Sequence, residues 1–344
     1  MDTKLEMETK KHWDVAVIGA GPAGLSAAEA LLRSRRTVIV LDDGRPRNAP
    51  AAGVHNFLTR DGTPPAELLA AGRGEVEAYG GVIVSAEATA ARRDGDGFAV
   101  TTGDGPGDSL VRARRLVVTT GLVDELPDVP GVRELWGSDV VHCPYCHGWE
   151  HAGEAIGVLG SGPMAVHQAL LFRQLTEDLV LFLHTAPPLT AEESEQLAAL
   201  GVRVITGRVR RLETAGAGGR LSGVRMGDGT FVPRACVAVG PRMVARSGVL
   251  AGLGLAAVPH AMGAAFGEFI ESDPTGRTAV PGVWVAGNVT DIQAHVIAAA
   301  AQGVMAGAAV NADLVAEDAR RAVEAARRAR RARGSFVGAA KDRR

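Results

Sequence analysis

A glycine-rich turn between a short apolar strand and a helix constrains the fold of this chain more than any other feature. Residues 14–18 (DVAVI) have the apolar, β-branched character of a buried strand, and residues 22–33 have helical spacing. The intervening GAGPAG, residues 19–24, has the GxGxxG form, and a second strand (TVIVL) follows at 37–41. A strand–turn–helix–strand unit of this kind builds a parallel sheet and is typical of nucleotide-binding domains.

A second copy of this unit follows later in the chain. It consists of the strand AIGVL, the turn GSGPMA at 160–165, a helix at 166–175 and the strand LVLFL at 179–183. Two such units predict an α/β fold with two Rossmann-like, three-layer nucleotide-binding domains. Glycine and proline cluster at 127–131 and 240–248, where we expect the chain to cross between the domains.

The composition is that of an ordinary globular protein. Of the 344 residues, 46% are apolar and 22% charged, which excludes a disordered chain, and three cysteines are too few for a disulfide framework. Residues 1–13 lack the apolar centre and cleavage site of a signal peptide, and the alanine-rich stretch 296–310 favours a packed helix over a membrane span. We therefore expect a cytoplasmic protein without a membrane partner.

Each glycine of the first turn has a physical role. Gly19 allows the tight turn, Gly21 lets backbone N–H groups approach a pyrophosphate, and Gly24 permits close helix–strand packing. Asp42 stands at the end of the next strand, where a carboxylate can accept hydrogen bonds from ribose hydroxyls, and Asp43 is the competing acid. The first unit is therefore predicted to bind an adenine dinucleotide.

The segment HCPYCHG, which begins at His142, carries two thiols separated by two residues. This spacing allows Cys143 and Cys146 to form a small disulfide loop, and a neighbouring imidazole can move the proton of thiol–disulfide exchange. His147 is the best candidate for this base, and His142 is a second one. Half of a zinc site is the alternative reading, but Cys236 lies in an apolar strand with no ligand beside it. We therefore expect a redox pair, no metal, and a core role for Cys236.

The order of these motifs resembles that of the low-molecular-weight thioredoxin reductases, from Trp13 to Val315. The resemblance implies an FAD-binding domain that is interrupted by a smaller domain. The implied divisions are 1–125 and 243–319 for the two parts of the FAD domain, 126–242 for an NADPH-domain-like module with the CxxC motif, and 320–344 for a basic tail.

Three further segments match motifs that contact FAD in that family. They are an Asn after the first unit in GVHNFL, the TG dipeptide of LVVTTG, and the TAVPGVWVAGN segment, which ends in Asn where the family usually has Asp. An amide can still form a hydrogen bond with a ribitol hydroxyl, so we expect FAD binding to persist. The predicted FAD contacts are Gly19, Gly21, Pro22, Ala23, Gly24, Asp42, Asn56, Thr120, Gly121, Gly287 and Asn288.

Other departures from the family concern proton transfer and NADPH. His147 replaces the acid that follows the second cysteine, with Glu150 as a candidate to orient it, and His295 aligns with a Gln that usually lies near the final helix. The His-Arg-Arg run that pairs with the 2′-phosphate of NADPH is missing, because residues 182–188 read FLHTAPP and no Arg follows before Arg203. Use of NADPH is therefore doubtful, and we read the second domain mainly as a scaffold.

A CxxCHG motif beside a weakened NADPH site resembles the FAD-dependent dithiol oxidases of the gliotoxin and holomycin type. This implies that a small-molecule dithiol closes to an intramolecular disulfide, while electrons pass through Cys143 and Cys146 to FAD and then to O₂. Cys146 is implied to be the flavin-side sulfur, and His147, with His142 or His295, to move the protons. The alternatives are an NAD(P)H-dependent reductase of thioredoxin or another disulfide, and a non-catalytic flavin-binding regulator. The resemblance also implies a homodimer.

The tail at 320–344 carries ten Lys and Arg against two Asp and Glu. Such a segment can bind nucleic acid or a membrane. No aromatic residue alternates with its arginines, so we favour a solvated helical extension and expect no nucleic-acid partner.

Overall fold

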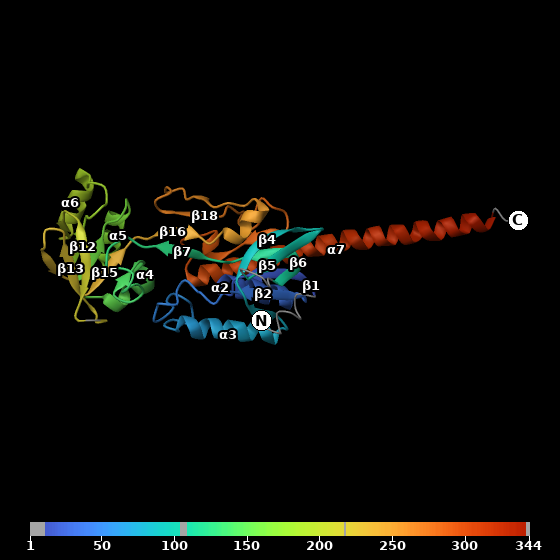
Figure 1. Ribbon diagram of the computed structural model, residues 1–344, viewed down its shortest axis with the longest axis horizontal. Coiled ribbons are helices and arrows are strands. Elements are labelled where there is room, and N and C mark those ends of the chain that lie inside the picture. Colours follow the sequence, from blue (N-terminus) through green and yellow to red (C-terminus); the bar gives the residue numbers. More distant parts are fainter. Residues whose placement is uncertain (1–10, 104–108, 217, 342–344) are drawn as a thin grey trace.

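The computed structural model describes residues 11–103, 109–216 and 218–341, with side chains up to residue 331. The segment in which we expect no signal peptide and the end of the basic tail therefore lie wholly or partly outside the described residues. Two lobes stand side by side, and a long C-terminal helix projects away from them (Figure 1).

The larger lobe contains the first predicted unit. Within the described residues its sheet has the order β3-β2-β1-β6-β5-β4, with β19 paired to β6 beside β5. β1, β2, β3, β6 and β19 are parallel, whereas β4, β5 and β6 form an antiparallel meander. The strands are β1 (His12–Ile18), β2 (Val38–Asp42), β3 (Val82–Ser85), β4 (Ala88–Asp94), β5 (Gly97–Thr102), β6 (Ser109–Val118) and β19 (Val283–Val285).

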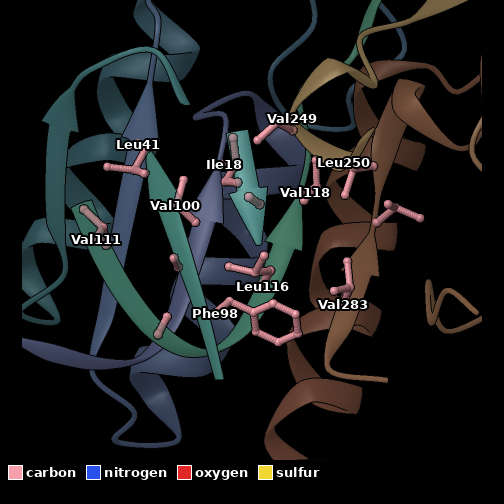
Figure 2. Close-up of a cluster of buried hydrophobic side chains, with 14 of the residues drawn as sticks. Ile18, Leu41, Phe98, Val100, Val111, Leu116, Val118, Val249, Leu250 and Val283 are labelled. Carbon is pink, nitrogen blue, oxygen red and sulfur yellow. The ribbon is translucent and has the colours of Figure 1, made fainter. Parts of the chain in front are cut away.

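Both faces of this sheet are buried, as expected for parallel strands. Val15 and Val17 of β1 pack toward the helices α2 (Pro22–Arg33), α3 (Pro65–Ala78) and α7 (Val296–Lys341). Ala16 and Ile18 point to the opposite face, where a second cluster includes residues of η2 (Gly248–Leu253) (Figure 2). The first domain thus has the predicted layered α/β form.

The smaller lobe contains the second unit. Its five-stranded parallel sheet, in the described chain, has the order β11-β10-β9-β15-β8. One face packs on a three-stranded antiparallel sheet and the other on two helices. These elements are β8 (Val140–Val141), β9 (Ile156–Leu159), β10 (Leu179–Phe182), β11 (Arg203–Ile205), β12 (Val209–Thr214), β13 (Leu221–Met226), β14 (Phe231–Pro233), β15 (Cys236–Val239), α5 (Ala165–Phe172) and α6 (Ala191–Ala199). Helix α5 begins one residue earlier and ends three residues earlier than predicted.

Two antiparallel strands join the lobes, β7 (Leu122–Glu125) and β16 (Arg242–Ala245). β16 falls inside the predicted crossing at 240–248, and β7 ends two residues before the other predicted crossing at 127–131. β16 also pairs in parallel with β18 (Gly267–Phe269), and β18 pairs antiparallel with β17 (Val258–Pro259). The short helices α4 (Pro144–His147), η1 (Trp149–His151) and η3 (Gly287–Val289) complete the fold.

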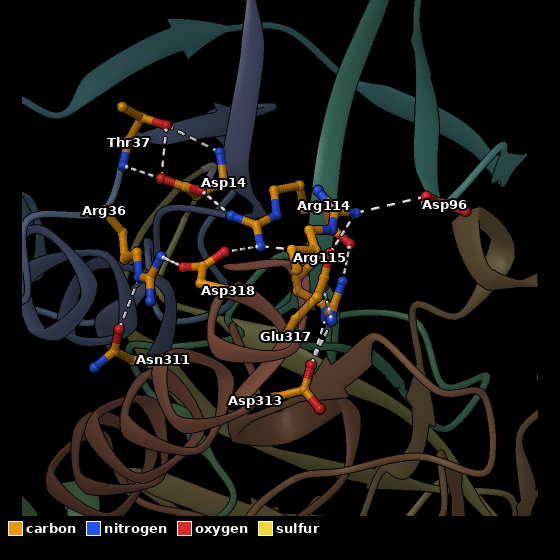
Figure 3. A network of polar contacts seen from close by, with 11 residues as sticks. Asp14, Arg36, Thr37, Asp96, Arg114, Arg115, Asn311, Asp313, Glu317 and Asp318 are labelled. Atoms are coloured by element: carbon orange, nitrogen blue, oxygen red, sulfur yellow. Dashed lines mark hydrogen bonds and ion pairs between the residues drawn. The ribbon is translucent and has the colours of Figure 1, made fainter. Parts of the chain in front are cut away.

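Helix α7 runs through residue 320 without a break, so the described part of the basic tail, 320–341, continues a core helix. Residues 296–331 are long and apolar enough to cross a membrane by length and composition alone. The first half of α7, however, contributes Ala306, Val310 and Leu314 to the core against α2. Asp313, Glu317 and Asp318 of the same helix form ion pairs with Arg36, Arg114 and Arg115 of the first domain (Figure 3).

Candidate active site

The first glycine turn brings the start of α2 directly onto the end of β1. Gly19 has a φ of +101°, and a Cβ there would lie 2.6 Å from the Thr119 carbonyl oxygen. A Cβ on Gly24 would lie 1.9 Å from the Gly19 carbonyl oxygen. Only glycine fits at these two positions, and α2 therefore begins at Pro22, immediately after Gly21.

A single cavity of about 1150 Å³ extends from this turn to the two sulfurs. A Cβ on Gly21 would meet no protein atom within 4 Å, so the turn leaves open space where a pyrophosphate would approach it. The cavity exceeds the usual size of a site for a drug-sized ligand. These features fit FAD. The predicted site residues that line the cavity are Gly19, Gly21, Pro22, Ala23, Asp42, Thr120, Gly121, His142, Cys143, Cys146, His147, Gly287, Asn288 and His295.

The two candidate acids differ in what they face. The Asp42 carboxylate accepts a hydrogen bond from the Ala20 backbone N–H at 2.9 Å, within the glycine turn, and also pairs with Arg73. Asp43 pairs with Arg45 at 2.8 Å instead. Asp42 is therefore the acid that faces the turn.

Asn288 donates two hydrogen bonds that an aspartate could not make. Its side-chain N–H group donates to the carbonyl oxygens of Asp291 at 3.0 Å and Ala294 at 2.9 Å, and its oxygen accepts from Arg47 at 3.2 Å. The neighbouring Gly287, with a φ of +73°, donates its N–H to Gln302. The departure from the family's usual Asp thus orders the loop that leads to His295.

Asn56 does not line the cavity. It is exposed, has a φ of +60°, and donates its side-chain amide to the Tyr145 carbonyl oxygen inside the CxxC loop at 2.6 Å. Its neighbour His55 pairs with Glu150 at 3.2 Å. Glu150, the candidate to orient His147, therefore contacts His55. The segment thus holds the CxxC module of the smaller lobe against the larger one.

The redox pair meets a histidine from the other lobe. Cys143 precedes α4 as its N-cap residue, and Cys146 lies within that single turn. The Cys143 sulfur lies 3.9 Å from Nε2 of His295, and these two atoms and the Cys146 sulfur are all within 4.8 Å of one another. His295 therefore lies beside the thiols.

The pKa values of the two thiols are shifted in opposite directions. A hydrogen bond from Cys146 and, against the effect of burial, the charge of His295 lower the pKa of Cys143 to about 6. The same hydrogen bond, together with burial, raises the pKa of Cys146. The first proton therefore leaves from Cys143. Burial also raises the pKa of Cys236, which lies in the core beneath α5 as predicted.

The other two candidate bases are held differently. His142 uses Nδ1 to contact the Val239 carbonyl oxygen at 3.1 Å, and Gln168 donates to the His142 carbonyl oxygen at 2.8 Å. Burial lowers the pKa of His142, and it lowers that of His147 too. Both imidazoles are thereby biased toward the neutral form, which can accept a proton.

The second glycine turn has a different geometry from the first. Gly160 is not in the left-handed region that Gly19 occupies, and α5 begins at Ala165, three residues after Gly162. The backbone N–H groups of Thr185 and Ala186 both donate to the Gly160 carbonyl oxygen. This loop replaces the one in which the family's arginines would stand.

Two arginines of the cavity wall carry no local sequence signal. Arg47 forms a two-pronged ion pair with Asp124 of β7 at 2.7 and 2.8 Å, and Arg73 of α3 pairs with Asp42. Arg47 comes from a loop without a motif and Arg73 from the surface of a helix. Only the folded chain brings them to the site.

Comparison with known proteins identifies the family. A model of the pyridine nucleotide-disulphide oxidoreductases matches residues 13–303. The chain belongs to this family. It is 33% identical over 321 residues to the thioredoxin reductase tcpT of Claviceps purpurea, covering 90% of this chain and 97% of that protein. It is 30% identical over 291 residues to the thioredoxin reductase aclD of Aspergillus oryzae, covering 80% and 88%.

Solved structures agree with the sequence comparison. The crystal structure of HlmI is 46% identical, with a TM-score of 0.84 and coverage of 92% of this chain and 97% of that chain. An oxidoreductase from Agrobacterium tumefaciens is 34% identical, with a TM-score of 0.81 and coverage of 89% and 99%. The likeness to thioredoxin reductases, the two-domain fold, the oxidoreductase class and FAD as the cofactor are thus confirmed.

Proposed function

We propose that the protein is an FAD-dependent oxidase that closes a small-molecule dithiol to an intramolecular disulfide, with O₂ as the electron acceptor. One observation carries the proposal. The Cys143–Cys146 pair and His295 line the same cavity as the first glycine turn, so cofactor and thiols share one space. A small dithiol that enters this space meets the redox pair without a protein carrier.

The geometry of the second unit supports the direction of electron flow. An NADPH donor needs phosphate contacts at the second turn, and a cation for its 2′-phosphate. The turn has the displaced helix start described above, and residues 182–202 contain no arginine. A substrate dithiol is then the more suitable source of electrons.

The chain's own groups account for the thiol chemistry. A substrate thiolate attacks the Cys143 sulfur, the Cys143–Cys146 bond breaks, and Cys146 takes the electron pair and a proton. The second substrate thiol loses its proton and attacks the substrate sulfur of this mixed disulfide, and Cys143 leaves as a thiolate. Its lowered pKa, to about 6, makes it a good leaving group.

His295 is the imidazole that we assign to the proton transfer at Cys143, because its Nε2 lies 3.9 Å from that sulfur. Bound FAD supplies the two-electron acceptor for the reduced pair and the route to O₂, which leaves as hydrogen peroxide. In total, one dithiol and one O₂ give one disulfide and one H₂O₂.

The second candidate is an NAD(P)H-dependent disulfide reductase, because several relatives are named thioredoxin reductases. An anaerobic experiment separates the two. The yellow holoprotein is mixed with dithiothreitol and, separately, with NADPH, and the visible flavin absorption is followed. We expect bleaching by the dithiol and none by NADPH within seconds; the reverse result would establish the reductase.

Two cysteine variants test the mechanism in air. Cys143→Ser should abolish dithiol-dependent peroxide formation, whereas Cys236→Ser, which changes a buried thiol outside the cavity, should leave it intact. Unchanged peroxide formation by Cys143→Ser would disprove this mechanism. A homodimer and a cytoplasmic location stay part of the proposal, and light scattering of the purified protein tests the first.

A further inference from the structure

The Cys143, Cys146 and His295 side chains form a donor set whose chemistry goes beyond dithiol oxidation. Two sulfurs and one imidazole nitrogen lie within 4.8 Å of one another, and all three residues are partly exposed. The sulfurs belong to the smaller lobe, and the nitrogen comes from the loop before α7 of the larger one. The set exists only because the two lobes meet here.

The spacing of these atoms suits a tetrahedral metal ion. With Zn–S bonds of about 2.3 Å and Zn–N bonds of about 2.0 Å, two ligands on one tetrahedral Zn²⁺ lie about 3.5 to 3.8 Å apart. The Cys143 sulfur and His295 Nε2 are 3.9 Å apart, so a shift of a few tenths of an ångström brings them to that spacing. All three residues line the cavity, so a water molecule can reach a bound ion from that side as its fourth ligand.

In place of the expectation from the sequence of no metal at this pair, we propose that the reduced protein binds one Zn²⁺ per chain through Cys143, Cys146 and His295, and that this binding blocks the redox pair. Thiolate and imidazole donors favour Zn²⁺ over Mg²⁺ or Ca²⁺, which prefer oxygen ligands. Each thiol that still carries a proton releases it when it binds the metal, and no electron is transferred. A chelator that removes the metal restores the free dithiol.

The redox state of the pair controls this site. A disulfide has no thiolate to offer, so the oxidised protein has lost two of the three ligands. Bound Zn²⁺ in turn keeps both sulfurs from forming the disulfide. Metal binding and oxidation are therefore mutually exclusive, whatever the natural electron donor or acceptor is, and the inference does not depend on the proposed function.

His295 distinguishes this site from an ordinary pair of vicinal thiols. A CxxC pair alone offers two ligands, whereas the third ligand here is the residue that replaces the family's usual Gln. Since loss of an outer partner of a metal ligand already costs 10–100-fold in affinity, loss of this ligand should cost at least about tenfold. The prediction therefore concerns one side chain from the other lobe.

The experiment titrates Zn²⁺ into the holoprotein and follows the heat of binding. The protein is either fully reduced by a phosphine under anaerobic conditions or left oxidised. We expect one Zn²⁺ per reduced chain and none per oxidised chain. His295→Ala and His295→Gln should bind at least about tenfold more weakly. His147→Ala, the same change next to the second cysteine, should bind as the wild type does.

Alkylation gives a second measurement that does not rely on affinity. Zn²⁺ should protect Cys143 and Cys146 of the reduced wild type from a thiol reagent, as read by mass spectrometry, and protection should weaken in His295→Gln. Retention of FAD by each variant checks that it is folded. Wild-type affinity in both His295 variants, equal loss in His147→Ala, or equal binding by oxidised protein would each overturn the proposal.

Discussion

The two glycine turns share the same first four-letter pattern, GxGP, yet they fold differently. The first has a left-handed Gly19 and a helix that begins right after Gly21, whereas the second has a helix that begins three residues after Gly162. The residue at the sixth position of each turn explains much of this difference in where the helix begins. Gly24 approaches the Gly19 carbonyl so closely that a Cβ would lie 1.9 Å from it, and the second turn has Ala165 in that place. A helix carrying this methyl group cannot begin on the turn in the same way.

This difference divides the work between the lobes. The first unit keeps the geometry that binds a dinucleotide, and the second keeps a parallel sheet that presents the CxxC loop. Because the second domain lacks this glycine contact and the phosphate arginines, we propose that it serves as a support for the thiols. The following predictions test this division, beginning with the largest effect.

The largest effect is expected from a matched pair of glycine substitutions. A Cβ on Gly21 or on Gly162 would meet no protein atom within 4 Å, so Gly21→Ala and Gly162→Ala add the same methyl group without a clash. Gly21→Ala should weaken FAD binding by about 1000-fold, because two lost hydrogen bonds to a charged phosphate together cost about 4 kcal/mol. Gly162→Ala should keep both FAD and dithiol oxidation. Absorbance of the purified proteins measures FAD content, and equal loss in both variants would refute the division.

The next effect concerns the histidine that the larger lobe contributes to the thiols. His295→Ala should lower dithiol oxidation about 100-fold, the lower range for loss of a proton-transfer group. It should also raise the pKa of Cys143 above about 6, because the charge of His295 helps to lower it. The pH dependence of alkylation of the reduced protein reads this pKa. His147→Ala should leave that midpoint unchanged; a shift there instead would assign the role to His147.

The sequence predicted those features of the fold and the site that depend on residues close together in the chain. Strand β1, helix α2 and strand β2 follow from a local apolar pattern and three glycines, and the CxxC pair from its spacing. It ranked His147 first among the candidate bases and gave no sign that His295 lies at Cys143, because the two residues are 152 positions apart and the contact forms only when the lobes meet. The positions of Arg47 and Arg73 in the cavity wall could not be predicted for the same reason. The two GxGP turns looked alike because Ala165 acts through packing, which the pattern does not display.

A smaller effect should follow from loosening α7 on the first unit. Glu317 pairs with Arg114, Arg115 and Arg321, and although burial opposes it, these charges lower its pKa below the ordinary value of 4.5. Its contribution is therefore present above pH 4.5 and is lost as the pH falls through the lowered pKa. Glu317→Gln should reduce the free energy of unfolding by about 2 kcal/mol at neutral pH.

The control for that variant lies two turns farther along the same helix. Glu324 is exposed and pairs only loosely with Arg328, at 3.6 Å, so Glu324→Gln should change the free energy of unfolding by less than about 1 kcal/mol. Thermal unfolding at pH 7 and pH 4, with FAD release as the signal, measures both variants. The difference between Glu317→Gln and the wild type should shrink at pH 4. A constant difference would contradict the assigned ion pairs.

The smallest effect separates two roles for Asn56. The family resemblance puts this residue near the flavin, whereas its amide bonds the Tyr145 carbonyl oxygen of the CxxC loop. Because its φ is +60°, Asn56→Gly removes the side chain without straining the backbone. Loss of the hydrogen bond to Tyr145, worth about 1 kcal/mol, should lower turnover several-fold. FAD content should stay unchanged, since Asn56 does not line the cavity. If FAD is lost instead, Asn56 helps to bind the cofactor even though it does not line the cavity.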